Sequence, residues 1–239
     1  MMKNIIFFDT ETTGNTNNDF LCQIAYKNNS ETFEGLYNPG MKIPPEASAV
    51  HHISNKMILD KDKFQESKDY SKIKNLFEDA NNVVVAHNAP FDLMIIKKEN
   101  IIPANFICTL RVARELDPEG KIERYNLQYL RYLLEIEVEA TAHDALGDVL
   151  VLEKLFERLK TKIKESEGLN DEEAIERMIE ISSHPSILRT INFGKYAGKK
   201  VEDIANIDRG YLEWLLGEKL KGEAPDEDWI YTLKHYLGK

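Results

Sequence analysis

The stretch that decides the fold lies near the start of the chain and reads Ile5-Ile6-Phe7-Phe8-Asp9-Thr10-Glu11-Thr12-Thr13-Gly14. Its four successive apolar residues, two of them β-branched, predict a buried strand. Asp9 and Glu11 stand two apart at the end of this strand, and the two-residue repeat of a strand places both carboxylates on one face. Because two close carboxylates repel each other, the pattern favours a hard divalent cation between them. The alternative is a strand that ends in solvated turn residues, since Asp, Thr and Gly all favour turns.

The composition bounds the class of protein. With 239 residues, 42% of them hydrophobic, the chain can form one large or two smaller domains. The formal net charge of -10 argues against a surface that coats nucleic acid broadly, but not against a nuclease, because metal ions bring positive charge to the site itself. Cys22 and Cys108 lack metal-ligand spacing, which is typical of reduced intracellular thiols. We find no signal peptide and no run of ~20 apolar residues, and therefore expect a soluble, cytoplasmic protein with no membrane partner.

Strand patterns alternate with helical patterns along the first two thirds of the chain. Residues 20–26 and 31–37 follow the first strand after short turns, which predicts an antiparallel meander. Asn88 and Thr109 are expected to cap helices that follow two more strands. These later strands, and two further helices, are expected at 83–86, 106–108, 126–134 and 142–164. This order predicts an α/β fold with a mixed sheet flanked by helices.

A domain boundary is expected after the long helix, because the sequence becomes charged near residue 165 and loses its strand pattern. Residues 1–165 are expected to form the α/β domain. The segment from Asn170 to Glu173 has the form of a capping box, so residues 166–184 are expected to form a linker helix. Residues 185–239 are then expected to form a small, mostly helical C-terminal accessory domain.

Acidic side chains close three core elements that are far apart in the sequence. Asp9 and Glu11 end the first strand. Asp92 is expected in the first turn of the helix that follows the strand at 83–86. Asp148 lies in the long helix, five residues after His143. Four converging carboxylates are what a two-metal phosphoryl-transfer site requires, in which ions ~3.5–4 Å apart stabilise the attacking and leaving oxygens. A histidine, with an ordinary pKa of about 6.5, suits the general base of such a reaction.

Three motifs, in this order, carry a family resemblance: Asp9-Thr10-Glu11, His87-Asn88-Ala89-x-Phe91-Asp92 and His143-x-Ala145-x-x-Asp148. They resemble the DEDD exonuclease superfamily, and the histidine marks its DEDDh subclass, whose fold is RNase H-like. Four further segments resemble the exodeoxyribonuclease X family within that subclass, so that the similarity covers nearly the whole chain: 47–53, 107–109, 193–199 and 232–237. The resemblance implies a metal-dependent 3′–5′ exonuclease that releases nucleoside 5′-monophosphates from DNA 3′ ends.

The resemblance also implies a role for each matching residue. Two divalent ions, Mg²⁺ (or Mn²⁺), would be held by Asp9, Glu11, Asp92 and Asp148, and His143 would be the general base. Substrate binding would involve Thr10, Thr12, Thr13, His87 and Asn88. Backbone groups near Thr12 and Thr13 would hold the terminal nucleotide, while His87 and Asn88 would shape the site rather than bind metal. Asp144 shares a helix face with Asp148 and is an alternative ligand, although the motif spacing favours Asp148.

Other functions stay open from the sequence. Related DEDDh enzymes act on RNA ends, so the substrate could instead be short RNA. A non-catalytic module that binds nucleic acid or a protein partner is a further alternative. The complete set of acids argues against such a module, because an inactive site would gain stability by losing repelling carboxylates. A homodimer is compatible with the sequence.

One departure from the family concerns the residues after Gly14. The nearest relatives carry a bulkier residue there, suited to wedging against a terminal base, whereas Asn15 and Thr16 are small and polar. The sequence therefore does not support an ability to pry apart a duplex end. His51 and His52 could line the substrate cleft, although a loop histidine bonded to the backbone is commoner.

Several basic residues are candidates for phosphate contacts. Arg111 and Arg114 could reach phosphates, although arginines on a surface helix usually do not. Three lysines and two aromatic residues near the C-terminal glycines could bind nucleic acid through charge and stacking: Lys195, Lys199, Lys200, Phe193 and Tyr196. The two aromatics could equally belong to the core of a small domain.

Overall fold

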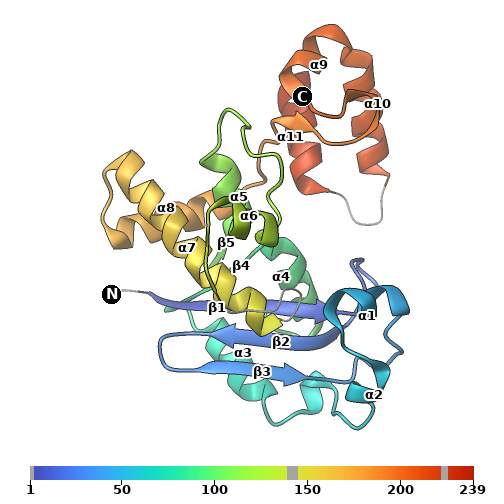
Figure 1. Ribbon diagram of the computed structural model, residues 1–239, viewed down its shortest axis with the longest axis vertical. Coiled ribbons are helices and arrows are strands. Elements are labelled where there is room, and N and C mark those ends of the chain that lie inside the picture. Colours follow the sequence, from blue (N-terminus) through green and yellow to red (C-terminus); the bar gives the residue numbers. More distant parts are fainter. Residues whose placement is uncertain (1–2, 139–144, 222–225) are drawn as a thin grey trace.

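A five-stranded mixed sheet forms the centre of the molecule (Figure 1), and the computed structural model describes residues 3–138, 145–221 and 226–239. The strands run in the order β3-β2-β1-β4-β5. Their bounds are β1 Asn4–Thr12, β2 Leu21–Lys27, β3 Thr32–Leu36, β4 Asn82–Ala86 and β5 Phe106–Cys108. The pairs β1–β2 and β2–β3 are antiparallel, whereas β4 pairs in parallel with β1 and β5 in parallel with β4. The predicted meander and mixed sheet are therefore confirmed.

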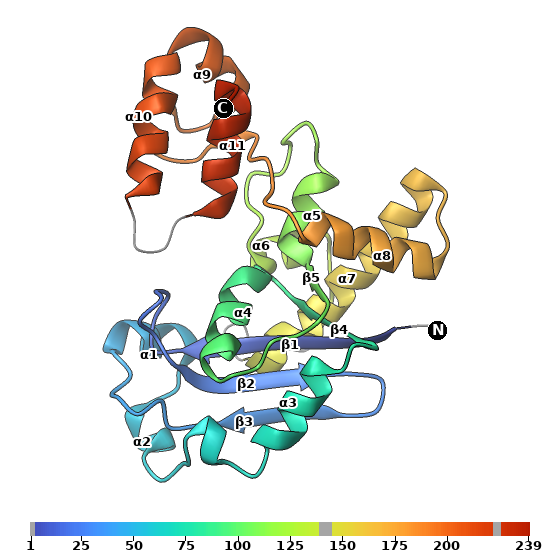
Figure 2. The same ribbon diagram turned by 180° about the vertical axis from the view of Figure 1, so that it is seen from behind.

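Helices cover both faces of this sheet, as Figures 1 and 2 show from opposite sides. In the first part of the chain they are α1 Pro45–His51, α2 Asn55–Ile58, the 3-10 helix η1 Phe64–Glu66, α3 Tyr70–Glu78, α4 Ala89–Lys98, α5 Thr109–Glu115, α6 Leu127–Leu133, α7 Ala145–Glu167 and α8 Asp171–Ser182. The capping box predicted before α8 is present, since Asn170 and Glu173 each bond the other's backbone N–H. None of the helices in the described ranges is long and apolar enough to cross a bilayer.

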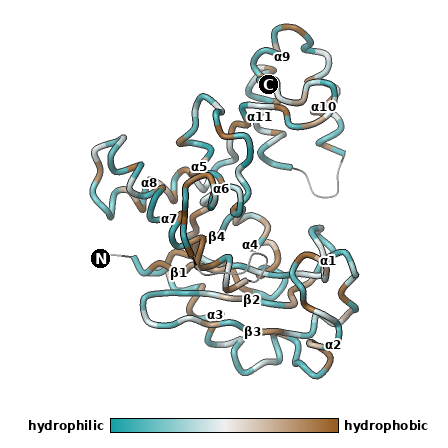
Figure 3. Tube along the Cα trace, in the orientation of Figure 1, coloured by the Kyte–Doolittle hydropathy of each residue, from teal (hydrophilic) through white to brown (hydrophobic). Residues whose placement is uncertain are grey.

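Strand β1 is buried on both faces, which explains its unbroken apolar run. Phe7 packs edge-on against Phe156 of α7, with ring centroids 5.2 Å apart. Phe8 points to the other face and packs against Phe77 of α3 at 5.0 Å. Each such buried side chain stabilises the fold by roughly 1.5–3 kcal/mol. Figure 3 shows the hydrophobic residues gathered along β1 and β4. The end of β1 is thus held rigidly between two helical layers.

The C-terminal part has a hydrophobic core of its own, drawn from Leu188 to Leu237. Its elements are β6 Thr190–Ile191, the 3-10 helix η2 Gly194–Tyr196, β7 Lys199–Lys200, α9 Val201–Ile207, α10 Arg209–Leu220 and α11 Glu227–Leu237. The predicted mostly helical character of this part is confirmed, whereas the short β6–β7 pair was not predicted. The domain limits at 165 and 184 stay predictions.

Two arginines predicted as surface residues are in fact interior connections between the domains. Arg111 of α5 is 6% exposed and donates from Nη1 to the carbonyl oxygen of Ser182 at 2.7 Å. Its Nη2 pairs with Glu227 of α11 at 3.2 Å. Arg114, one turn later, pairs with Asp228. These arginines join the α/β domain to α11, and sequence position alone did not show the burial.

Two predicted helix caps were wrong in detail. Asn88 does precede α4, but it has a left-handed backbone (φ 64°, ψ 42°) and its side chain makes no capping bond. Thr109 is the first residue of α5 rather than its cap, and Cys108 occupies the cap position. The side chain of Asn88 lines a cleft instead, and the hydroxyl of Thr109 bonds His87.

Candidate active site

The structure brings together three of the predicted acidic residues. The carboxylates of Asp9 and Glu11, on β1, and of Asp148, on α7, each offer an oxygen within 4.8 Å of the others. Oxygen ligands from carboxylates are what Mg²⁺ and Mn²⁺ prefer, so the donor set fits a divalent cation. Among the described residues these three form the only such group of acidic, histidine or cysteine side chains.

Register and packing place the three acids at one spot. Asp9 and Glu11 pair across the sheet with Ala25 and Gln23 of β2, so both lie on the face that α7 covers. The first turn of α7 is tied to β2, because the backbone N–H of Ala145 donates to Oε1 of Gln23 at 3.4 Å. Gln23 is 5% exposed. This buried amide sets the start of the helix that carries Asp148.

A second amide, Gln128 of α6, holds Asp148 directly. Its Nε2 donates to Oδ1 of Asp148 at 2.5 Å. Its Oε1 in turn accepts from Nη1 of Arg131 at 3.4 Å. A carboxylate fixed by a donor on a neighbouring helix is oriented before any ligand arrives. No sequence pattern indicates this contact, since a glutamine on an amphipathic helix is ordinarily a solvated residue.

Asp92 lies next to the cluster but is engaged elsewhere. Its Oδ1 accepts from the backbone N–H of Thr10 at 3.1 Å and from the hydroxyl of Thr10 at 2.7 Å. Burial raises the pKa of Asp92 to about 7, and the two bonds from Thr10 oppose that rise only in part. Asp92 therefore joins α4 to the residue between Asp9 and Glu11, and it is not one of the three grouped acids.

The predicted general base and the alternative ligand cannot be placed. His143 and Asp144 lie outside the described residues, so the base stays a prediction. Asp148 belongs to the acid group, but because Asp144 lies outside the described residues the choice between the two aspartates stays a prediction.

The three threonines of the first motif are buried and bonded within the chain. Thr10, Thr12 and Thr13 are 6%, 6% and 2% exposed. Thr12 donates its hydroxyl to the carbonyl oxygen of Gly14, and Thr13 donates to Asp19 at 2.8 Å. The backbone N–H of Thr13 is also used, by the carbonyl oxygen of Phe20 at 3.0 Å. These bonds shape the end of β1, and the predicted contacts with a terminal nucleotide stay predictions.

The turn after β1 is closed by Asp19. Its carboxylate accepts from the backbone N–H of Thr16 at 2.8 Å and from the Thr16 hydroxyl at 2.7 Å. A Cβ at Gly14 would lie 2.7 Å from the same carboxylate, so a larger residue there would displace Asp19 from these bonds. The Thr16 side chain is therefore part of the turn, which agrees with the expectation that it does not act as a wedge.

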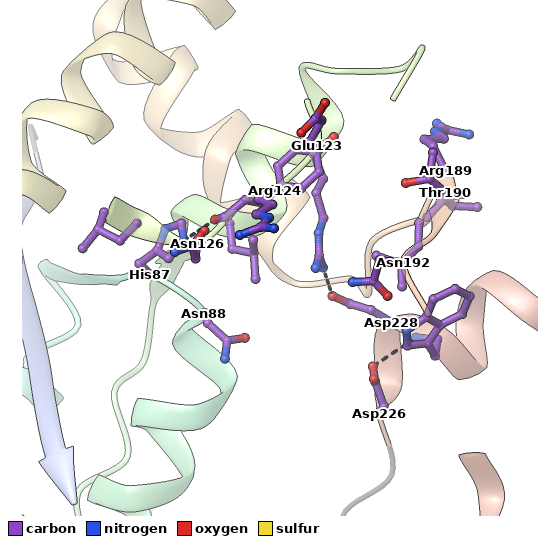
Figure 4. Close-up of a pocket in the computed structure, with 17 residues that line it drawn as sticks. His87, Asn88, Glu123, Arg124, Asn126, Arg189, Thr190, Asn192, Asp226 and Asp228 are labelled. Atoms are coloured by element: carbon purple, nitrogen blue, oxygen red, sulfur yellow. Dashed lines mark hydrogen bonds and ion pairs between the residues drawn. The ribbon is translucent and has the colours of Figure 1, made fainter. Parts of the chain in front are cut away.

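His87 connects β4 to the segment before α6. Its Nε2 lies 2.6 Å from the carbonyl oxygen of Tyr125 and must carry the proton, so that Nδ1 accepts from the hydroxyl of Thr109 at 2.9 Å. Burial lowers the pKa of His87 to about 4, which keeps the ring neutral. Both nitrogens are occupied, and this supports the expectation that His87 shapes the site rather than binds metal. Asn88 instead turns its amide into a cleft between the domains (Figure 4).

His51 is bonded to the backbone, as the commoner alternative for a loop histidine predicted. Its Nε2 donates to the carbonyl oxygen of Thr12 at 3.2 Å, and its Nδ1 accepts from the N–H of Ile53 at 3.1 Å. Burial lowers the pKa of His51. His51 thus fastens α1 to the end of β1, whereas His52 is exposed.

The fold and the acid group together define a class of protein. Carboxylates from the central strand and from a helix across it form an acidic group whose oxygen donors fit the divalent cations that phosphodiester hydrolases use. Residues 6–156 match the family model described as Exonuclease, and residues 191–219 match the one described as Exodeoxyribonuclease X-like C-terminal.

Individual proteins show the same relationship. The chain is 33% identical over 203 residues to Exodeoxyribonuclease 10 of Escherichia coli (strain K12), covering 84% of this chain and 83% of that protein. It is 33% identical over 202 residues to a DNA polymerase III subunit epsilon-like protein of Rhodobacter capsulatus, covering 78% of this chain and 27% of that protein.

Solved structures agree. Exonuclease X in complex with 5′ overhanging duplex DNA superposes with a TM-score of 0.58 and 26% identity, covering 74% of this chain and 99% of that chain. Escherichia coli Exonuclease I in complex with a dT13 oligonucleotide shares the fold, with a TM-score of 0.58, 20% identity and coverage of 70% and 43%. The chain therefore belongs to the DEDDh exonuclease family, which is divalent-metal dependent, and it is a 3′–5′ exonuclease.

Proposed function

We propose that the enzyme removes nucleotides from the 3′ ends of DNA and releases nucleoside 5′-monophosphates. Two Mg²⁺ (or Mn²⁺) ions would be held by the carboxylates of Asp9, Glu11 and Asp148, with Asp92 beside them. His143 would be the general base. The observation that carries the proposal is the group of three acids within 4.8 Å, which would be unfavourable in a metal-free site because like charges repel.

The chemistry of the proposal is hydrolysis of one phosphodiester bond. The oxygen of a water molecule bonds to the terminal phosphorus, and the bond from phosphorus to the 3′ oxygen of the preceding nucleotide breaks. His143 takes a proton from the water, and the departing 3′ oxygen takes a proton from solvent to become the hydroxyl end of the shortened strand. Bound divalent ions would supply the positive charge that offsets the charge developing on the phosphate oxygens.

The residues around the acids keep them in position during this reaction. Gln128 holds Asp148 from α6, and Thr10 holds Asp92 from β1. Neither contact involves substrate, so Asp148 and Asp92 are oriented by the chain itself. Preorganised polar groups of this kind need no rearrangement when charge develops in the transition state.

DNA is the proposed substrate because of the relatives. One is named an exodeoxyribonuclease, and one solved relative holds duplex DNA with a 5′ overhang. The sequence similarity supports DNA as the substrate, since the match to Exodeoxyribonuclease 10 spans most of both chains.

The test uses DNA and RNA oligonucleotides of one sequence, labelled at either end, with Mg²⁺, Mn²⁺ or EDTA. We expect a descending ladder from 5′-labelled DNA, immediate release of a labelled mononucleotide from 3′-labelled DNA, and no product in EDTA. A ladder from RNA alone would overturn the choice of DNA. An absence of metal-dependent cleavage with every substrate would overturn the proposed function as a whole.

A further inference from the structure

Helix α6 exposes an aromatic surface beside the acid group. Its inner side buries Leu127 and Leu130, while Tyr132 is 75% and Leu133 48% exposed. A shallow groove of about 370 Å³ runs along this outer side and is lined by Arg124, Asn126, Gln128, Tyr129, Tyr132 and Leu133. Tyr129 is partly buried and lies one turn before Tyr132 on the same side of the helix, so the exposed ring is that of Tyr132.

The groove leads to the proposed catalytic site. Gln128, which lines it, donates to Asp148 at 2.5 Å. The hollow therefore reaches a residue that touches one of the three grouped acids. A strand whose 3′ end lies at those acids would pass directly over α6.

At its other end the groove joins the cleft between the domains. Arg124 and Asn126 line both hollows, and the cleft has a volume of about 620 Å³. Figure 4 shows Arg124 and Asn126 on one wall, with Asn192 and Asp228 of the C-terminal part on the other. The two hollows together form one path from the acids to the C-terminal domain.

The cleft is lined by residues of both charges, the arginines Arg114, Arg124 and Arg189 and the acids Glu123, Asp226 and Asp228. Arg124 is exposed and forms no ion pair with the residues that the structure describes. Nε of Arg189, in the cleft, is buried and has no hydrogen-bond partner among them. The two aspartates of the cleft are already satisfied, Asp226 by Lys219 and the backbone of α11, and Asp228 by Arg114.

One face of Tyr132 is supported by a cation. The guanidinium of Arg131 lies over the ring, 5.6 Å from its centroid. The ring is fixed in this way while most of its surface stays in solvent. A flat, supported and exposed ring next to a lone arginine is the combination that binds an unpaired base and its phosphate.

We propose that this groove, along α6, binds the unpaired nucleotides that precede the 3′ end. A base stacks on Tyr132, a backbone phosphate pairs with Arg124, and the strand continues into the cleft toward Arg189. This inference rests on the proposed function for its direction, because Gln128, which lines the groove, bonds Asp148 of the acid group. It assigns single-stranded 3′ ends as the substrate class.

The main test measures binding of a 5′-fluorescein-labelled deoxythymidine decamer in EDTA, where metal-dependent cleavage is stopped. Tyr132→Ala should weaken binding about 5- to 100-fold, the effect of losing one stacked base. Tyr231→Ala is the matched control, since Tyr231 is a 44% exposed aromatic outside the groove and the cleft. Binding of Tyr132→Ala within twofold of the wild type would overturn the proposal.

A second measurement isolates the phosphate contact. Arg124→Gln should reduce the slope of log affinity against log salt by roughly 0.7, the contribution of one phosphate contact on a single strand. Arg158→Gln, an exposed arginine on α7, should leave the slope unchanged. An unchanged slope for Arg124→Gln would contradict the assignment of Arg124. Equal losses for a blunt duplex would contradict the assignment of an unpaired strand.

The outcomes separate this inference from the proposed function. If the wild type binds the decamer through Tyr132 but cleaves nothing with Mg²⁺ or Mn²⁺, the groove stands and the proposed function fails. If it cleaves DNA while both variants bind like the wild type, the proposed function stands and the groove proposal is wrong.

Discussion

The acid group at the end of β1 and the groove along α6 are neighbours, yet they are built in opposite ways. Around the acids, side chains are buried and bonded within the chain, as Thr10 is to Asp92 and Gln128 to Asp148. Along the groove, Tyr132 and Arg124 are exposed. The difference teaches that this fold fixes the groups proposed for chemistry and leaves the groups proposed for binding a strand open to solvent. Variants of Asp9, His143, Asp92 and Gln128 test the bonded side of that contrast, and Tyr132→Ala and Arg124→Gln test the exposed side.

The largest expected effect is on catalysis through the acid group. Asp9→Asn keeps the size of the side chain but removes a charged oxygen ligand, so we expect DNA cleavage to fall by at least about 10²-fold. Stability should be equal or higher, because repulsion within the group is relieved. The measurement is the rate of ladder formation in Mg²⁺, alongside a urea melt. Asp203→Asn on α9 is the control, and a residual rate within tenfold of the wild type would count against Asp9 as a ligand.

His143→Ala tests the proposed base. We expect a loss of roughly 10²–10⁴-fold in the maximum rate, because a positioned general base contributes about that much. The affinity for Mn²⁺ should be retained, since a base is not a ligand. If Mn²⁺ affinity falls together with the rate, His143 is a metal ligand instead.

Asp92→Asn should stabilise the metal-free enzyme at alkaline pH. The ordinary pKa of 3.8 is raised to about 7 in the fold, so the carboxylate favours its protonated form in the folded state. The free energy of unfolding therefore falls as pH rises from about 4 to 7, by up to about 4 kcal/mol. The amide keeps an oxygen to accept from Thr10 and lacks this charge.

The experiment compares the stability of Asp92→Asn and the wild type in EDTA at pH 4 and at pH 8. His87, with a pKa lowered to about 4, makes both proteins lose stability as pH falls from 6.5 to 4. Taking the difference between the proteins removes that shared contribution. We expect the variant's advantage to appear at pH 8 and to vanish at pH 4, and an advantage that is the same at both would contradict the raised pKa.

The smallest expected effect comes from replacing Gln128, which lines the groove and bonds Asp148 of the acid group. Gln128→Leu replaces the amide that bonds Asp148 with an apolar side chain one atom shorter, and we expect the Mn²⁺ concentration needed for half activity to rise about 10- to 100-fold. Gln65→Leu is the control, because Gln65 donates to a backbone carbonyl oxygen on the surface. If Gln128→Leu needs no more Mn²⁺ than the wild type, the acid does not depend on α6 for its orientation.

The sequence predicted the parts of the fold that depend on local pattern. The strand before Asp9 was evident because it is apolar on both faces, and the box at Asn170 because both partners lie within one turn. The motifs placed Asp148 in the acid group, although its position relative to Asp9 depends on a helix that begins far along the chain.

The missed features depend on contacts between distant segments. Gln23 bonds a backbone group 122 residues away, and Arg111 one 71 residues away, so neither burial nor partner follows from local sequence. The left-handed backbone of Asn88 also depends on distant segments, because the packing of α4 on the sheet sets this turn. The side chain of Asn88 therefore does not make the expected capping bond. The β6–β7 pair has two residues in each strand, too few for a repeat to be recognised.

The central claim is that the acids on β1 and α7 share divalent ions. Calorimetric titration of the wild type, of Asp148→Asn and of Asp203→Asn with Mn²⁺ tests it directly, without substrate. We predict that the wild type and Asp203→Asn bind two ions per chain and that Asp148→Asn loses at least one of them. Equal binding by all three proteins would contradict the account, because the ions would then lie away from this group.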